Sequence, residues 1–238
     1  MLTLAIDTSE EICALALGRD SQLLCEYHFY AKMRLLRMLV PSIERLLQDV
    51  GCAQNEIDGI VVCLGPGSFT GLRIGVTTAK SLAYALDVPI VGVGTLDAIA
   101  RSAAPTATEI ICPMIHARTN EVYWSLFDPT GQVRLEEYEV GTLHAAMDAA
   151  AGRAKTVHFC GSGAVKNAEE IRHRFGENAV IGEAWSALAR GAAILEIGNK
   201  RLREKRFDDA FALTPMYIRK PTPVVRLETG EFEKPKKG

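Results

Sequence analysis

Apolar residues in the first hundred positions first alternate with polar ones and then recur at helical spacing. Residues 3–7, 12–17 and 23–30 alternate as three successive strands, and turn residues 18–21 separate the last two. Over residues 33–50 apolar side chains recur every three or four positions and stop at Gly51, which predicts an amphipathic helix kinked at Pro41. A strand at 60–64, a helix at 72–86 and a strand at 90–93 follow. The expected unit is three strands, a helix, a strand, a helix and a strand.

The second half of the chain repeats this pattern. Strands are predicted at 109–115, 121–127, 133–138 and 156–160, and helices at 143–151, 164–175 and 186–200. We therefore expect two lobes built from one repeated unit, with mixed sheets flanked by helices. The first lobe should span residues 1–105, and a second, smaller lobe with a closing helix should span 106–220. Residues 221–238 contain few apolar side chains and are expected to be disordered.

Composition narrows the class of protein without naming an activity. The chain has 238 residues, 48% of them apolar, and a net charge of -2, which is typical of a globular protein. It shows no basic leader and no apolar run of about 18 residues, so we expect a cytoplasmic protein that does not enter a membrane. The six cysteines form no C-x-x-C pair and the five histidines no H-E-x-x-H, so no metal site is expected.

The most specific motif is the glycine-rich run from Gly65 to Gly75, which joins an apolar strand to an apolar helix. Its backbone N–H groups, the helix N-terminus and Arg73 can hold an anion, with Thr70 as a candidate cap. The same run can equally be a turn that packs strand on helix, and it matches neither G-x-x-x-x-G-K-[ST] nor G-x-G-x-x-G. The candidates for a vestigial nucleotide site are Asp7, Thr8, Ser9, Gly65, Gly67, Ser68, Thr70 and Gly71.

Other candidate chemistry is weaker. A duplicated unit with an acid at the end of its first strand is the layout of two ribonuclease-H-like lobes in the actin-like ATPase superfamily, which includes sugar kinases and heat-shock chaperones. Only Asp7 fits such an acid, because the matching strand of the second half carries His116, and a turn-capping role for residues 7–9 stays open. The basic run 200–206 is either a solvated helix end or a contact for nucleic acid within a larger complex.

Four segments resemble the TsaB family, also called YeaZ. They are Leu4-Ala5-Ile6-Asp7-Thr8-Ser9, the glycine run 65–75, Ala117-Arg118 with Glu121-Val122-Tyr123-Trp124, and Pro215-x-Tyr217-x-Arg219. The resemblance implies a non-catalytic scaffold of the actin-like fold that binds and activates the transferase TsaD. The modification is threonylcarbamoyladenosine (t6A), which lies beside the tRNA anticodon. TsaD-like proteins carry an H-x-x-x-H pair, which this sequence lacks.

The resemblance also implies partners and a partner face. The helices at 33–50 and 72–86 are expected to pack on TsaD, and the ATPase TsaE to join the assembled pair. No cofactor is expected to bind tightly, and ATP or tRNA would be met only in the complex. The expected contacts are Met33, Leu36, Arg37, Leu39, Val40, Ile43, Arg73, Val76 and Lys80.

The sequence departs from the family pattern at two places, and three alternative interpretations of its function or of its apolar helix face stay open. Lys32-Met33-Arg34-Leu35-Leu36 replaces the family's usual Arg-x-His-[Ser/Thr], and His116 replaces an Asp. An ATP-dependent kinase or a peptidase of the same fold stays the alternative to a scaffold. The same apolar helix face could instead join two copies of this chain in a homodimer, or fill the chain's own core.

Overall fold

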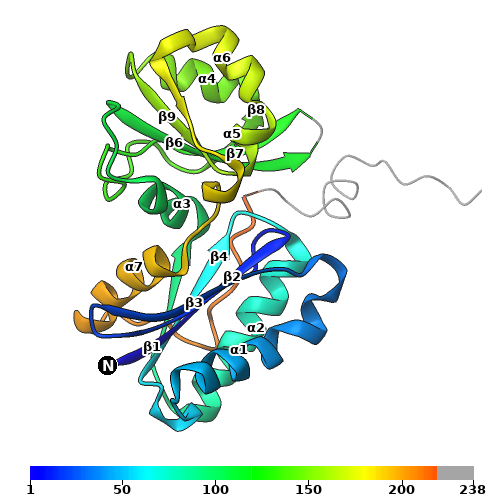
Figure 1. The fold of residues 1–238 in the computed structure, drawn as a ribbon, viewed down its shortest axis with the longest axis vertical. Helices are drawn as coiled ribbons and strands as arrows, with labels where there is room; N and C mark the ends of the chain where they lie inside the picture. The colour runs from blue at the N-terminus through cyan, green and yellow to red at the C-terminus, as the bar shows by residue number, and fades with distance from the viewer. Residues whose placement is uncertain (119, 219–238) are drawn as a thin grey trace, which may run out of the picture.

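The computed structural model describes residues 1–118 and 120–218, without the side chain of Arg118, and shows two lobes stacked along the long axis (Figure 1). In the first lobe a mixed sheet has the order β3-β2-β1-β4-β5, and in the second the order is β10-β9-β6-β7-β8. Each sheet pairs its first three strands antiparallel and its fourth and fifth in parallel. The expected repeat is therefore confirmed. The strands are β1 (Leu2–Asp7), β2 (Ile12–Arg19), β3 (Gln22–Tyr30), β4 (Gly59–Gly65), β5 (Ile90–Gly94), β6 (Ile110–Arg118), β7 (Glu121–Trp124), β8 (Glu139–Thr142), β9 (Val157–Cys160) and β10 (Ala179–Ile181).

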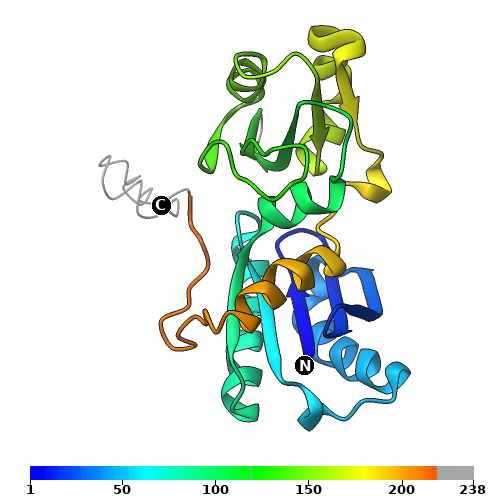
Figure 2. The same ribbon diagram turned by 90° about the vertical axis from the view of Figure 1, so that its left-hand side faces the viewer.

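Helices cover both faces of the first sheet, as Figures 1 and 2 show from two directions. Because side chains alternate along a strand, Leu4 and Ile6 of β1 enter the core under α1 and α2, whereas Ala5 enters a second core with α3 and α7. The second core contains residues of both lobes as well as residues of α3, so it joins the two lobes. The helices are α1 (Leu35–Val50), α2 (Phe69–Leu86), α3 (Thr95–Ala103), α4 (Leu143–Ala151), α5 (Ser162–Lys166), α6 (Ala168–Phe175) and α7 (Gly191–Arg203). Short 3-10 turns are η1 (Lys32–Arg34), η2 (Gln54–Glu56), η3 (Gly176–Asn178) and η4 (Ala184–Ser186).

Several element boundaries differ from the sequence-based prediction. The strand expected at 133–138 is wrong. The Asp128 carboxylate accepts the N–H groups of Gln132 and Val133 and shapes a turn there. After this turn only Arg134 forms a β-bridge, with Phe127. The third strand is β8 instead. The helix expected at 164–175 breaks at Asn167, whose side-chain amide donates to the carbonyl of Gly163 at 2.7 Å. A nine-residue helix, α3, was not predicted.

The end of the described chain returns to the first lobe. Helix α7, expected at 186–200 as part of the second lobe, packs on β1, β2, β4 and β5. Residues 207–217, here called the strap, then cross from the edge of β5 to α2 (Figure 2). The Asp208 N–H donates to the Ile90 carbonyl at 2.9 Å, and the Met216 N–H donates to the Leu64 carbonyl at 2.7 Å. Helix α7 and the strap, which were expected in a second lobe spanning residues 106–220, therefore pack with the first lobe. Residues 221–238 lie outside the described residues.

Candidate functional site

The glycine-rich run is packed against the turn that follows β1. The Ser68 N–H donates to the Ser9 carbonyl at 2.6 Å, and the Thr8 hydroxyl donates to the Gly71 carbonyl at 2.8 Å. A Cβ atom at Gly67 would lie 2.3 Å from the Ser9 oxygen, and one at Gly71 would lie 2.1 Å from the Thr8 oxygen. Only glycine permits this approach of two backbones. The interpretation of the run as a packing turn therefore accounts for Gly67 and Gly71.

The N-cap residue of α2 lies within the same glycine-rich run. Ser68, rather than Thr70, is the N-cap residue, and its hydroxyl accepts the Gly71 N–H at 3.2 Å. Helix α2 consequently begins at Phe69, three residues before the helix that the sequence predicted.

Asp7, the only acid that fitted a nucleotide site, lies in the core. The residue is 3% exposed, and its carboxylate accepts the Ser9 N–H at 2.9 Å. Burial raises the pKa of Asp7 above its ordinary value, although hydrogen bonds from Ser9 and Cys63 oppose the rise. A carboxyl that is buried and held by its own turn is not placed to reach a ligand in the space between the lobes.

We expect Asp7→Asn to remove a pH dependence of stability. The stability contributed by protonated Asp7 is fully present below an ordinary carboxyl pKa and is lost as pH rises through the raised value. Asparagine keeps the oxygen that accepts the Ser9 N–H but does not ionise. Thermal unfolding at a series of pH values should show the melting temperature of the wild type falling relative to Asp7→Asn as pH rises. A constant difference at every pH would contradict this.

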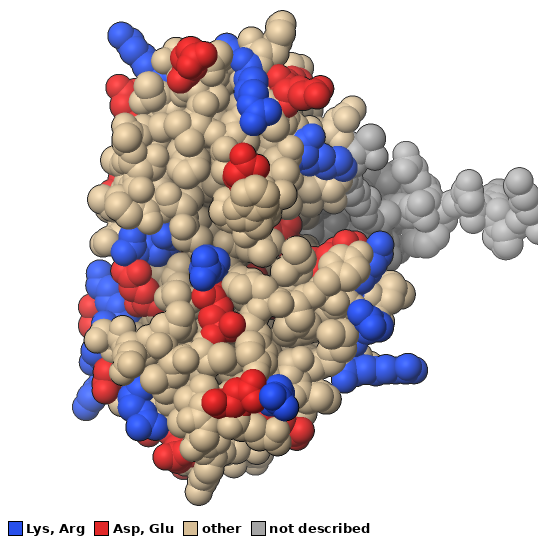
Figure 3. Space-filling view, in the orientation of Figure 1, with Lys and Arg blue, Asp and Glu red and all other residues tan. Residues whose placement is uncertain are grey.

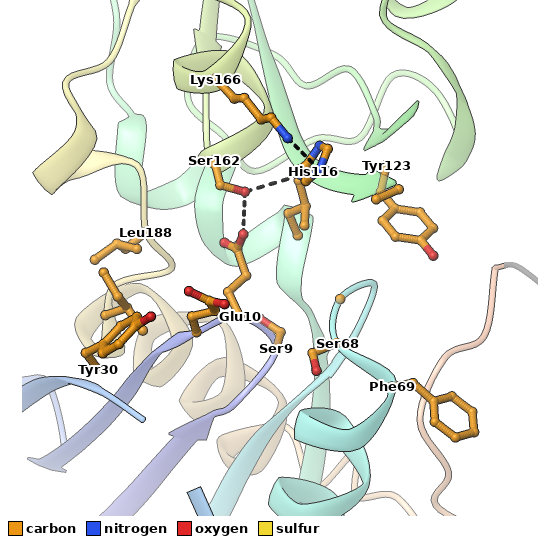
Figure 4. Close-up of a pocket in the computed structure, with 15 residues that line it drawn as sticks. Ser9, Glu10, Tyr30, Ser68, Phe69, His116, Tyr123, Ser162, Lys166 and Leu188 are labelled. Atoms are coloured by element: carbon orange, nitrogen blue, oxygen red, sulfur yellow. Dashed lines mark hydrogen bonds between the residues drawn. The ribbon is translucent and has the colours of Figure 1, made fainter. Parts of the chain in front are cut away.

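A cleft of about 670 Å³ separates the lobes at the carboxyl end of β1 (Figure 4). Of the nucleotide-site candidates only Ser9, Gly67 and Ser68 line it, whereas Asp7, Thr8, Gly65, Thr70 and Gly71 do not. The remaining lining residues are Glu10, Glu11, Ile12, Tyr30, Phe69, Ile115, His116, Ala117, Tyr123, Ser162, Lys166 and Leu188. The structure therefore brings together a set of side chains different from the predicted one.

The polar centre of this cleft was not predicted. In Figure 4, Glu10 of the first lobe points toward Ser162 of the second, and the Ser162 hydroxyl donates to the Glu10 carboxylate. The same oxygen of Ser162 accepts the His116 backbone N–H at 3.2 Å, and the His116 ring nitrogen Nε2 lies 2.8 Å from the Lys166 Nζ. Burial first, and then the charge of Lys166, lower the pKa of His116. Neither residue 10 nor residue 162 sits in a motif that sequence inspection marks as chemical.

The expected partner face divides into exposed and buried residues. Met33 is 92% exposed, Leu36 76% and Val40 47%, and Arg37 beside them is also exposed. The expectation for Leu39, Ile43 and Val76 is wrong in this conformation. All three belong to the core beneath α1 and α2, so their side chains cannot contact a partner.

Two further expected contacts are used by the strap. The Arg73 Nε donates to the Tyr217 hydroxyl at 3.0 Å, and its guanidinium lies 3.8 Å from the Phe69 ring centroid. The Lys80 ammonium donates to the carbonyls of Phe211 and Leu213. Both side chains hold the chain's own C-terminal segment against α2.

Surface charge gives no continuous basic stripe on the face that Figure 3 shows, where Lys and Arg alternate with Asp and Glu. Within the basic run, Arg201 pairs with Asp208 at 3.0 Å and Arg206 pairs with Glu204. Among the described residues, no three His, Cys, Asp or Glu side chains converge in a geometry that could hold a metal ion. Nor does any helix in residues 1–118 and 120–218 combine the length and apolar character needed to span a membrane.

Comparison with known proteins gives a consistent picture. The family model for TsaD, tRNA N6-adenosine threonylcarbamoyltransferase, matches residues 30–222. The tRNA threonylcarbamoyladenosine biosynthesis protein TsaB of Bacillus subtilis is 31% identical over 92% of this chain and 94% of its own length. A Pseudomonas aeruginosa protein solved as similar to peptidase YEAZ superposes with a TM-score of 0.78 at 27% identity, covering 92% of this chain and 99% of that one.

The fold is also shared with a nucleotide-binding protein. The activator of 2-hydroxyisocaproyl-CoA dehydratase from Clostridium difficile, solved with bound ADPNP, has a TM-score of 0.50 at 11% identity, covering 87% of this chain and 97% of that one. At this identity the likeness concerns the fold alone. The two mixed sheets flanked by helices have the actin-like fold expected from the repeated unit.

Proposed function

The chain belongs to the TsaB proteins of tRNA threonylcarbamoyladenosine biosynthesis, within the broader family that the TsaD model describes, and we propose that it is the non-catalytic subunit that binds and activates a TsaD-type transferase. The role in t6A synthesis follows from the family. Binding and activation of the partner are the proposed step.

The observation that carries the proposal is an apolar stripe on α1. Met33, just before the helix, and Leu36 and Val40 within it are exposed at spacings of three and four residues, with Arg37 beside them. A helix normally turns such side chains to the core, and α1 already buries a second stripe containing Leu39 and Ile43. An additional exposed apolar stripe on a helix is typical of a surface that packs on another protein.

The proposal leaves the ATP chemistry to the assembled complex. In this chain the glycine-rich run packs against the Thr8–Ser9 backbone, and Asp7 is buried. We propose that ATP, a TsaE-type ATPase and tRNA meet the complex rather than the free chain. Without its partner, the stripe could bury itself against a second copy, so a homodimer is the expected competitor of the heterodimer.

The test is reconstitution of t6A formation with purified TsaD-type and TsaE-type partners, tRNA, ATP and the threonylcarbamoyl donor. We expect this chain alone to form no t6A and to leave ATP unhydrolysed, and its addition to the other components to raise t6A formation by at least about tenfold. Undiminished t6A formation without the chain would contradict the proposal. ATP turnover by the chain alone, abolished by Asp7→Ala, would instead favour the kinase of the same fold.

A further inference from the structure

The two walls of the cleft carry opposite charges. Glu10 extends into the cleft from the turn after β1 in the first lobe, and Lys166, the last residue of α5, lines it from the second lobe (Figure 4). Ser162 and His116 connect the two, because the Ser162 hydroxyl donates to Glu10 Oε1 and the Lys166 Nζ lies 2.8 Å from His116 Nε2. An acid and a base therefore face one space from different lobes.

Both charged groups keep unused hydrogen-bonding capacity. Within residues 1–118 and 120–218, neither Glu10 nor Lys166 forms an ion pair. Glu10 uses only Oε1 for its bond to the other lobe, so Oε2 can accept from a ligand. The Lys166 ammonium has three donors, of which the His116 ring can take one. The other acid of the lining, Glu11, is already paired with Lys32 at 3.7 Å.

We propose that the cleft binds a small zwitterion of the α-amino-acid class, with its ammonium at Glu10 Oε2 and its carboxylate at Lys166 Nζ. A polyphosphate would bring negative charge to Glu10, and a polyamine would bring positive charge to Lys166. Only a ligand with both charges compensates both walls. The site lies beyond the proposed scaffold role and does not depend on it.

The surroundings of Glu10 favour a cationic ligand group. The side chain is half-buried, and burial raises the pKa of its carboxyl to about 7. A carboxyl that is costly to ionise alone is stabilised in its charged form by an ammonium beside it. The ligand therefore supplies the counter-charge that Glu10 lacks in the free chain.

The size and the lining of the cleft suit an amino acid. Its volume of about 670 Å³ lies within the range of about 300–1,000 Å³ that is usual for small-molecule sites, so the lobes need not move to admit the ligand. Ile12, Ile115 and Leu188 give it apolar walls. Such walls pack against an apolar ligand side chain and strengthen the neighbouring charge pairs by keeping water away.

The site can be tested with the full chain and free amino acids. Each of the standard L-amino acids, at about 5 mM and about pH 7.5, is first screened for a rise in melting temperature. Isothermal titration calorimetry of the best one should show saturable binding with a Kd below about 1 mM. Two derivatives of that amino acid follow. The N-acetyl derivative lacks the ammonium and the carboxamide lacks the carboxylate, so each should bind at least about tenfold more weakly.

Two variants assign the charges to the walls. Glu10→Gln keeps an oxygen that accepts from Ser162 but loses the charge, so it should no longer prefer the amino acid over its N-acetyl derivative. Lys166→Met keeps the length of the side chain and should no longer prefer the amino acid over its carboxamide. Glu177→Gln and Lys200→Met make the same changes at exposed positions outside the cleft and should bind as the wild type does. Circular dichroism checks that each variant is folded.

Three results would overturn the site. They are a screen in which no amino acid raises the melting temperature, derivatives that bind as tightly as the amino acid itself, and an affinity that neither Glu10→Gln nor Lys166→Met lowers. The assay contains no partner protein, so its result is independent of the scaffold role.

Discussion

Leu36→Glu should strongly weaken association with the TsaD-type partner and leave this chain folded. The side chain is 76% exposed in the free chain, so the substitution removes no core contact. In the complex it would bury an unpaired carboxylate in an apolar interface, which costs about 2–4 kcal/mol and weakens affinity by roughly 30-fold to 1,000-fold. Isothermal titration calorimetry of both forms measures the difference.

Two control variants separate loss of the interface from loss of the fold. Val133→Glu introduces the same charge at an exposed apolar position of the second lobe and should bind as the wild type does. Leu39→Glu places the charge in the core, where the side chain is 1% exposed, and should unfold the protein by losing about 4 kcal/mol or more. If Val133→Glu weakened binding as much as Leu36→Glu, the stripe on α1 would not be the partner face.

Gly71→Ala should destabilise the protein strongly although it adds one methyl group. The new Cβ would lie 2.1 Å from the Thr8 carbonyl oxygen, which is backbone and cannot move without disturbing β1. We expect a loss of about 3 kcal/mol, which lowers the melting temperature of a chain of this size by roughly 6–12 °C. Differential scanning calorimetry checks the value.

Gly152→Ala is the matched control for that substitution. Gly152 ends α4 in a right-handed conformation, and a Cβ there meets its nearest neighbour at an ordinary 3.4 Å. Its melting temperature should stay within about 2 °C of the wild type. Normal stability of Gly71→Ala, together with loss of ATP binding, would support the anion site that the sequence left open.

Local patterning predicted most of the fold. Strands β1 to β5 and helices α1, α2 and α4 lie close to their expected positions because alternation and helical spacing are properties of neighbouring residues. The misassignment of α7 and the strap to the second lobe depends on contacts distant in sequence, whereas the strand at 133–138 and the helix at 164–175 failed through local side-chain hydrogen bonds. Helix α7 packs on the first sheet, and the strap is held to the first lobe through Asp208, Lys80 and Leu64; no local signal reports such a return.

The site was predicted less well than the fold because it depends on contacts between residues that are distant in sequence. The sequence marked the glycine run as a turn that holds either an anion or a neighbouring segment. Only the structure shows that its neighbour is the Thr8–Ser9 backbone. Periodicity also could not divide the apolar residues of α1 between the core and the surface. Leu36 and Leu39 look equivalent in sequence, yet one is exposed and the other buried.

Size-exclusion chromatography with light scattering, applied to this chain and the TsaD-type protein from the same organism, tests the proposed scaffold role. The two chains, each also run alone, are mixed in equal amounts at micromolar concentration. The proposal predicts a single species with the summed mass of one copy of each, and a smaller share of this species when Leu36→Glu replaces the wild type. Two separate peaks at the masses of the unmixed proteins would contradict it.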